Sequence, residues 1–236
     1  MRTAFAVTMC VLMLTAPAHA QDFNFDANQE SVRNQSLNTN IIHVGGLIRE
    51  QAQKGDQRES LPQNPILLFD ATTERRVENF DNLIRQNFGR DPARAETMAQ
   101  AMGNGKILVD VGDLIEARGL NRHNIADVYA WWSIEAWKHA NGVNGETSDI
   151  TLRAVQKQMA DMMVASPEIA QLDDATKQRF TEQLMFQAVL MSLRKNELQG
   201  QAGSNAEYRQ WIEGHAKNMG FALSAMTLTD KGFVPK

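Results

Sequence analysis

The stretch that most restricts how this chain can fold is residues 124–141, NIADVYAWWSIEAWKHAN. It holds three of the four tryptophans and one of the two tyrosines. When residues are placed 100° apart, as on an α-helix, its apolar side chains cover an unusually wide arc. Each tryptophan brings roughly 150–250 Å² of surface to bury, and a helix this apolar is normally surrounded by others. The stretch therefore predicts a central helix around which the rest of the fold packs.

Both ends of this helix carry recognisable signals. Asn124 followed by Asp127 resembles a capping box, with Asp in place of the usual Glu. Asn141 and Gly142 both tolerate the left-handed backbone that ends many helices. We therefore expect the helix to begin just after Asn124 and to end at Asn141.

The polar residues of the central helix fall on one arc. Trp131, Glu135, Lys138 and His139 lie within about 120° of Asp127 on a helical wheel. The four-residue spacing of Asp127, Trp131, Glu135 and His139 predicts a polar stripe that faces solvent or a partner. The alternative is a reactive site, because a carboxylate beside a histidine can raise its basicity or share a metal ion with it. No H-E-x-x-H motif is present and further ligands are lacking, so we predict no metal-binding and no catalytic residue.

The first 20 residues, MRTAFAVTMCVLMLTAPAHA, have the pattern of an export signal. Arg2 precedes an apolar run, and Ala-His-Ala at residues 18–20 is a typical cleavage site. The apolar run is too short to cross a bilayer comfortably, which takes about 20 residues, although a retained anchor is the alternative to cleavage. We expect a mature chain that begins at Gln21, has no transmembrane segment and is periplasmic or secreted.

The composition of the mature chain excludes some kinds of stabilisation and some partners. The only cysteine, Cys10, lies inside the export signal, so no disulfide can form and packing alone must stabilise the fold. The formal net charge is −4, and it becomes −5 when the signal with its single charged residue, Arg2, is removed. Nucleic-acid binding and attraction to anionic lipid both call for a basic surface, so we expect neither.

A polar leader, residues 21–65, follows the signal. It is rich in Asn, Gln, Asp and Ser, and its apolar residues concentrate in the segment 41–48, IIHVGGLI. So few apolar residues can be buried that they do not balance the conformational entropy lost when a chain becomes ordered. We therefore predict a largely disordered leader with one short piece that docks on the domain as a strand or helix. The leader is either a tether or partner-binding arm, or a plain spacer.

Residues 66–236 predict a single all-α domain. Apolar residues recur there at three- and four-residue spacing between Gly, Pro and Asn breaks, which is typical of an irregular bundle of about six to seven helices. Alternating polar and apolar residues at 226–229, followed by a turn, predict a C-terminal hook that docks Leu228 and Phe233 on the bundle. The expected helices are 73–88, 92–102, 106–118, 124–141, 150–165, a long one from Asp173 or Asp174 to 198, and a last one opened by the S-x-x-E capping box at 204–207.

Motifs for catalysis or cofactors are missing from this domain. Five methionines at helical spacing would suit copper(I) in an exported protein, but such methionines more often fill a core: Met159, Met162, Met163, Met185 and Met191. The sequence has no G-x-S-x-G, P-loop or G-x-G-x-x-G motif. We therefore predict no cofactor.

Two segments carry a resemblance to a known family. The central NIADVYAWWSIEAW and the terminal AMTLTDKGFVPK resemble the hallmark segments of a family of exported bacterial proteins known only as a domain of unknown function. His123 stands where the family commonly has Asp, and Val128 replaces a small residue, but neither change disturbs the pattern. The resemblance covers roughly residues 66–236. It implies export and the boundary of the fold, and it brings no activity or catalytic residue.

We interpret the chain as an exported bacterial protein with a non-enzymatic binding or envelope accessory role. Its expected partner is an unknown protein or another component of the envelope, and no nucleic acid. The alternative is a hydrolase or a metal-dependent enzyme that uses Asp127, Glu135 and His139. The two interpretations differ in whether these side chains converge in a pocket or lie along a flat stripe.

Overall fold

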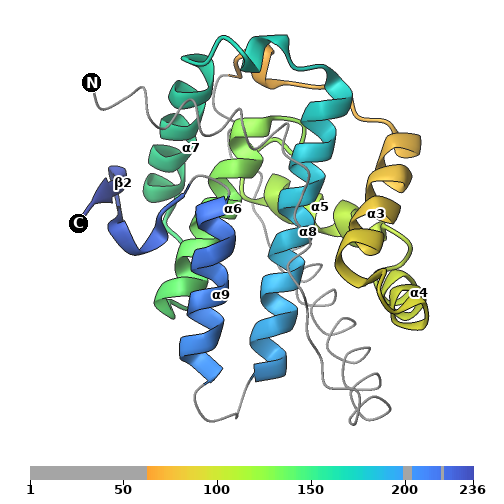
Figure 1. Ribbon diagram of the computed structural model, residues 1–236. Coiled ribbons are helices and arrows are strands. Elements are labelled where there is room, and N and C mark those ends of the chain that lie inside the picture. Colours follow the sequence, from red (N-terminus) through yellow and green to blue (C-terminus); the bar gives the residue numbers. More distant parts are fainter. Residues whose placement is uncertain (1–62, 199–203, 219–220) are drawn as a thin grey trace.

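The computed structural model describes residues 63–198, 204–218 and 221–236, so the predicted signal, the leader up to residue 62 and the segment 41–48 lie outside the described residues. Figure 1 shows a bundle of α-helices with a β-hairpin on one side. Seven α-helices in this part of the chain confirm the predicted all-α bundle with a C-terminal hook. The α-helices are α3 (Thr73–Phe88), α4 (Pro92–Ala101), α5 (Lys106–Ala117), α6 (Ile125–Asn141), α7 (Asp149–Val164), α8 (Asp174–Leu198) and α9 (Ser204–Asn218). The short 3-10 helices are η2 (Pro65–Leu67), η3 (Ile169–Gln171) and η4 (Leu223–Ala225), and the strands are β1 (Met226–Thr229) and β2 (Gly232–Pro235).

Side chains cap the helices close to where the sequence predicts. Thr72 accepts a hydrogen bond from the backbone N–H of Arg75 at 3.2 Å and so starts α3. Asp91 accepts one from the N–H of Arg94 at 3.1 Å, directly before Pro92 at the first position of α4. These local bonds explain why the helix boundaries agree with the prediction to within one or two residues.

The turn between α4 and α5 is tight. Gly103, Asn104 and Gly105 all have positive φ values, 61°, 47° and 94°. A Cβ on Gly105 would lie only 3.3 Å from Cγ of Phe80, so the backbone there is packed directly against α3. Such a run of left-handed residues favours glycine and is fixed in place by this contact.

The central helix α6 begins and ends as predicted, but its capping box is only half formed. Oδ1 of Asn124 accepts hydrogen bonds from the N–H groups of Ala126 and Asp127, at 2.9 and 3.3 Å. The carboxylate of Asp127 does not return to the N–H of Asn124, which donates instead to the carbonyl of Asn121 at 3.0 Å. At the other end, Gly142 takes a left-handed conformation with φ of 67°.

Helix α6 forms the centre of the bundle, between α7 and α9 on one side and α8 on the other (Figure 1). The opposite side of α8 packs against α3 and α5. Trp132 is only 1% exposed. Small buried residues let the neighbouring helices approach α6 closely: Ala126, Ala130, Ser133 and Ala136. Among the described residues, no helix is both long enough and apolar enough to cross a membrane.

The segment that precedes α3 ties α6 to α8. Leu68 forms a β-bridge with Asn124 of the α6 cap, and its carbonyl accepts a hydrogen bond from Nζ of Lys177 on α8 at 3.1 Å. Asn64 caps η2 with its side chain. Gln63 and Asn64 belong to the predicted leader, yet both make ordered contacts in the domain.

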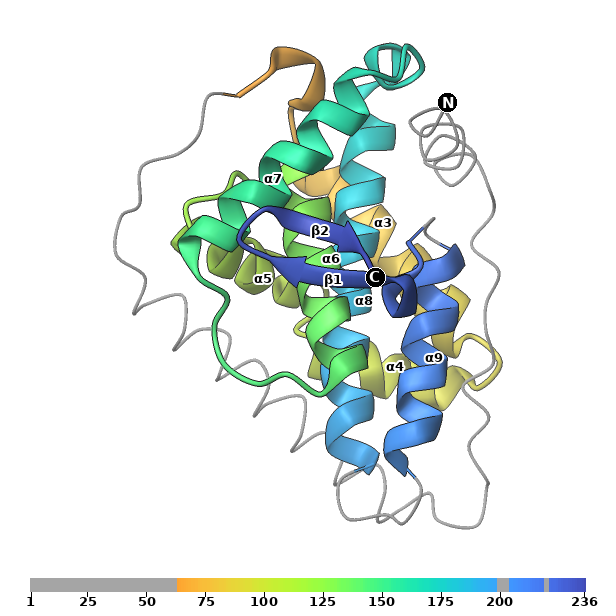
Figure 2. The ribbon, with the colours of Figure 1, turned by 90° about the vertical axis from the view of Figure 1, so that its left-hand side faces the viewer.

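The hairpin lies across α6 beside α7 (Figure 2). Its strands are antiparallel, with Leu228 opposite Phe233. Phe233 is buried and Leu228 packs partly buried against the core, which confirms the predicted docking of the hook. Two side chains pin the hairpin: Nε1 of Trp137 donates to the carbonyl of Met226 at 3.1 Å, and the amide of Gln158 bonds both backbone groups of Phe233, at 2.8 and 2.9 Å.

Candidate functional site

The first residue of the predicted stripe, Asp127, lies in a buried network of amides. Its carboxylate accepts hydrogen bonds from the N–H of Asn121 at 2.8 Å, from Nε2 of Gln156 at 2.7 Å and from Nε2 of Gln63 at 3.4 Å. Oε1 of the same Gln63 accepts a hydrogen bond from the side chain of Asn124. Burial raises the pKa of the Asp127 carboxyl, while these hydrogen bonds act in the opposite direction. The network joins the start of α6 to α7 and to the segment before α3.

The expectation that the stripe faces solvent or a partner is wrong for Asp127 and Trp131. Asp127 is 1% exposed and Trp131 is 7% exposed. The helical wheel fails here because α7, α8 and α9 surround α6, so even its more polar arc is covered. Asp127 tolerates this burial because amide and backbone donors satisfy its carboxylate.

The third residue of the stripe, Glu135, is half-buried and forms a local ion pair. Its two carboxylate oxygens lie 2.9 and 3.2 Å from Nζ of Lys138, three residues further along α6. The side chains of Glu135 and Lys138 are 26% and 14% exposed. This pair leaves the carboxylate engaged within its own helix rather than directed at His139.

The last residue of the stripe, His139, packs against α9. Its Nδ1 lies 2.8 Å from the hydroxyl of Tyr208, which donates a hydrogen bond to the carbonyl of Met191 at 2.9 Å. Because that hydroxyl has a single proton, it accepts from Nδ1–H of a neutral histidine. Burial, together with Lys195 and Lys138, lowers the pKa of His139 to about 4. The imidazole is therefore neutral at physiological pH.

The four residues of the stripe do not form one site. Asp127 and His139 stand twelve positions apart, which is about 18 Å along a helix with a rise of 1.5 Å per residue. Within the described residues, no three His, Cys, Asp or Glu side chains gather closely enough to hold a metal ion. The methionines considered for copper belong to the hydrophobic core or pack against it: Met159, Met162, Met163, Met185 and Met191. The arrangement supports packing and pairing between helices rather than a shared chemical step.

A second buried polar cluster joins α3 to α8, and sequence reasoning missed it. Glu182 is 4% exposed and accepts hydrogen bonds from Nδ2 of Asn79 at 2.6 Å and Nε2 of Gln178 at 2.9 Å. Nε of Arg76 lies 3.3 Å from the same carboxylate. Burial raises the pKa of Glu182, against the effect of these partners. The four-residue spacing of Gln178 and Glu182 was visible in the sequence, but their partners on α3 were too distant to be inferred.

The two outer edges of the hairpin differ. The N–H and carbonyl of Phe233 point away from β1 toward Gln158, so the pair formed by Phe233 and Leu228 is a non-hydrogen-bonded one. The backbone groups of Leu228 must therefore point away from β2, and they make no hydrogen bond within the part of the chain that the structure describes. The outer edge of β2 is closed at Phe233, while that of β1 is open at Leu228.

One exposed apolar side chain lies close to the tip of this hairpin. Ile150, in the first turn of α7, is 67% exposed. Thr151 donates a hydrogen bond to Asp230 of the tip at 2.6 Å, which fixes the hairpin beside the start of α7. We define Ile150 and the hairpin tip as the α7-tip surface.

Residues 2–235 match a family model described as a family of unknown function, DUF6683. The chain belongs to the DUF6683 family. The match begins much earlier than the expected residues 66–236, so it includes the leader together with the helical domain. The DUF6683 description names no activity, and it therefore assigns no role to any residue. No match is found among curated proteins or among solved structures.

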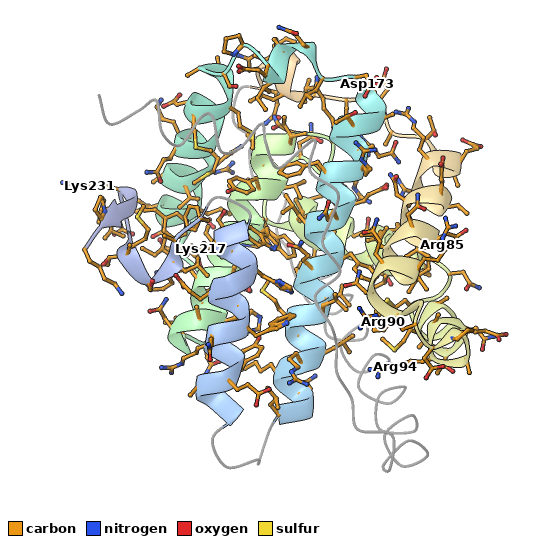
Figure 3. All side chains as sticks on the ribbon, viewed as in Figure 1. Arg85, Arg90, Arg94, Asp173, Lys217 and Lys231 are labelled. Atoms are coloured by element: carbon orange, nitrogen blue, oxygen red, sulfur yellow. The ribbon has the colours of Figure 1, made fainter. Side chains whose placement is uncertain are left out.

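Three arginines of this DUF6683 chain project from the corner of α3 and α4, far from Lys231 at the hairpin tip (Figure 3). Arg85 donates to Oδ1 of Asn82 at 2.6 Å, and the guanidinium of Arg94 lies 5.6 Å from the centre of the Phe88 ring. The third, Arg90, is exposed. Because Arg85 bonds a side chain of its own helix and Arg94 of α4 lies over the Phe88 ring of α3, this corner does not by itself define a binding site for anions.

Proposed function

We propose that this chain is an exported, non-enzymatic helical domain that acts by binding a partner protein, with an accessory role in the cell envelope. The observation that carries the proposal is that each polar residue of the stripe bonds a different partner. Asp127 is bonded to amides, Glu135 to Lys138 and His139 to Tyr208. General acid–base catalysis or metal binding needs such groups to meet around one reacting atom, and these lie along some 18 Å of helix.

The export part of the proposal rests on the sequence of residues 1–20. It is tested by the intact mass of the protein recovered from outside the cytoplasm, which should begin at Gln21. A mass that retains residues 1–20 would contradict cleavage and favour a retained anchor.

The non-enzymatic part is tested by thermal unfolding of the purified protein with a chelator, with zinc and with copper(I). We expect no shift in the melting temperature, because no set of three metal ligands gathers in the described residues. A metal bound at a hundred times its dissociation constant would add about 2.7 kcal/mol, which this measurement detects. A drop with chelator that Glu135→Gln and His139→Ala abolish would overturn the proposal in favour of a metal-dependent enzyme.

The partner-binding part has a natural candidate in the α7-tip surface. A photo-crosslinking amino acid at Ile150, which is 67% exposed, should give a discrete adduct in the intact envelope. The matched control is Val77, which is 50% exposed on α3, on the other side of the bundle. Adducts of equal yield from the two positions would show that the α7-tip surface has no special role.

A further inference from the structure

The chain contains three Asn-Gly pairs, at residues 104–105, 141–142 and 144–145. In such a pair, the backbone nitrogen of the glycine can attack Cγ of the asparagine side chain. A bond from N to Cγ forms, the bond from Cγ to Nδ2 breaks, and ammonia leaves with the proton that the glycine amide has lost. Water then opens the cyclic imide to aspartate or isoaspartate, without oxidation or reduction. Glycine favours the attack because no Cβ hinders the approach.

The pair at Asn141 is held by helix α6. Asn141 is the last residue of α6, and its Nδ2 donates to the carbonyl of Trp137 at 2.9 Å. The N–H of Gly142 donates back to the last turn of the helix, to the carbonyl of His139. Both reacting groups are therefore engaged, and the helical backbone keeps them from meeting.

The pair at Asn104 is held by the tight turn before α5. Asn104 and Gly105 take consecutive left-handed conformations, and Gly105 is buried against the ring of Phe80. Cyclisation requires the backbone to rotate at this pair. The contact with Phe80 resists that rotation.

The pair at Asn144 is free to react. Asn144 and Gly145 are exposed in the irregular connection between α6 and α7, and nothing lies within 4 Å of the position where a Cβ on Gly145 would stand. The N–H of Gly145 makes no hydrogen bond to the described residues. The attacking nitrogen is thus accessible to solvent base and able to turn toward the side chain.

Lys195 of α8 adds a second observation at the same place. Its Nζ donates a hydrogen bond to Oδ1 of Asn144 at 3.2 Å. Attack on Cγ places negative charge on this oxygen in the tetrahedral intermediate. A positioned cationic donor stabilises such an oxyanion more than it stabilises the starting carbonyl.

We propose that Asn144 is a self-modification site, at which the chain converts asparagine to aspartate or isoaspartate with solvent water as the only co-reactant. Lys195 stabilises the oxyanion during the attack. The product carries a carboxylate opposite the ammonium of Lys195, so the modification replaces an ammonium–amide hydrogen bond between the α6–α7 connection and α8 with an ion pair. The isoaspartate product also lengthens the backbone of this connection by one carbon.

The first test is incubation of the folded, full chain in mildly alkaline buffer, followed by peptide mapping with mass spectrometry. Deamidation at Asn144 should be at least about tenfold faster than at Asn141 or Asn104, a barrier difference of about 1.4 kcal/mol. In denaturant the three rates should converge, because the local sequence Asn-Gly is shared. Equal rates at the three positions in the folded chain would overturn the proposal.

The second test separates the part played by Lys195. Lys195→Met should slow deamidation at Asn144 about tenfold, while Lys195→Arg, which keeps a cationic donor, should change it little. Circular dichroism checks that both variants keep the fold. An unchanged rate in Lys195→Met would overturn the role of Lys195, and an equal loss of rate in Lys195→Arg would overturn it as well.

Discussion

Protonation of His139 should lower the free energy of unfolding by about 2–3 kcal/mol when the pH falls from about 7.5 to about 4.5. Burial, then Lys195 and Lys138, lowers the pKa of His139 from 6.5 to about 4. The unfolded chain therefore binds the proton more tightly than the folded chain does. The stabilising contribution is fully present above about pH 6.5 and is lost as the pH falls toward 4.

The magnitude follows from the two pKa values. One pKa unit corresponds to about 1.4 kcal/mol, so a difference of about 2.5 units limits the effect to about 3.4 kcal/mol at very low pH. At about pH 4.5 most of this is lost, which gives about 2.5 kcal/mol. Because His139 is mostly buried against α9 rather than solvent-exposed, solvent screening reduces this figure only modestly.

Urea unfolding across this pH range measures the effect, with His139→Asn as the reference variant. Asparagine places its Nδ2 where the imidazole has Nδ1, so it keeps a donor for the hydroxyl of Tyr208 but cannot be protonated. Carboxylates titrate equally in the wild-type protein and in His139→Asn. The difference between their unfolding free energies therefore reports the titration of His139 alone. A difference that stays constant from about pH 7.5 to about pH 4.5 would refute the reasoning.

Tyr208→Phe tests the stated cause. It removes the hydrogen bond to His139 but keeps the aromatic ring that covers it. Since burial is the main cause of the lowered pKa, this variant should be less stable by about 1–3 kcal/mol yet keep most of the pH dependence.

Three further predictions concern packing. Trp132→Ala should cost about 3–5 kcal/mol of unfolding free energy in urea, because Trp132 is 1% exposed at the centre of α6. Lys138→Ala should cost about 1 kcal/mol or less, because it removes only a partly exposed ion pair. Similar losses in the two variants would show that the packing of α6 is described wrongly. Removing residues 21–62 should change the unfolding free energy by less than about 1 kcal/mol. Extending the deletion to Pro65 should cost about 1–2 kcal/mol more, because the hydrogen bonds of Gln63 and the cap by Asn64 are lost. Equal stability of the two deletion variants would contradict this. Gln158→Ala should speed hydrogen exchange at the backbone amide of Phe233 and cost about 1–3 kcal/mol of unfolding free energy. Gln158→Glu keeps an acceptor for that amide and should retain its slow exchange. Equally fast exchange in both variants would contradict the hydrogen bond from Phe233 to Gln158.

The sequence was sufficient for the parts of the fold that local interactions decide. Thr72, Asp91 and Asn124 cap their helices through bonds to residues two or three positions away, and Gly142 ends α6 by its own conformation. The hook was predictable because alternation and a turn signal lie within ten residues of each other. These features need no knowledge of the rest of the chain.

The environment of the stripe was not predictable in the same way. A helical wheel compares residues of one helix with each other, and it placed Asp127 on the polar side. The partner that decides the environment of Asp127 is Gln156, which follows 29 residues later on α7. His139 likewise depends on Tyr208, 69 residues away. Tertiary contacts of this range determine whether a polar residue is solvated or buried.

The closed edge at Phe233 limits how copies of this chain can assemble through their hairpins. A sheet with two open edges can add a neighbour on each side and so grow into a filament. Here the amide of Gln158 occupies the edge of β2 at Phe233, while on β1 the backbone groups of Leu228 make no hydrogen bond to the described residues. Two copies that met through β1 would form a closed, two-fold pair, each still capped by its own Gln158. Pairing through this edge of β1 therefore leaves no second open edge at Phe233 from which a fibre of sheets could grow.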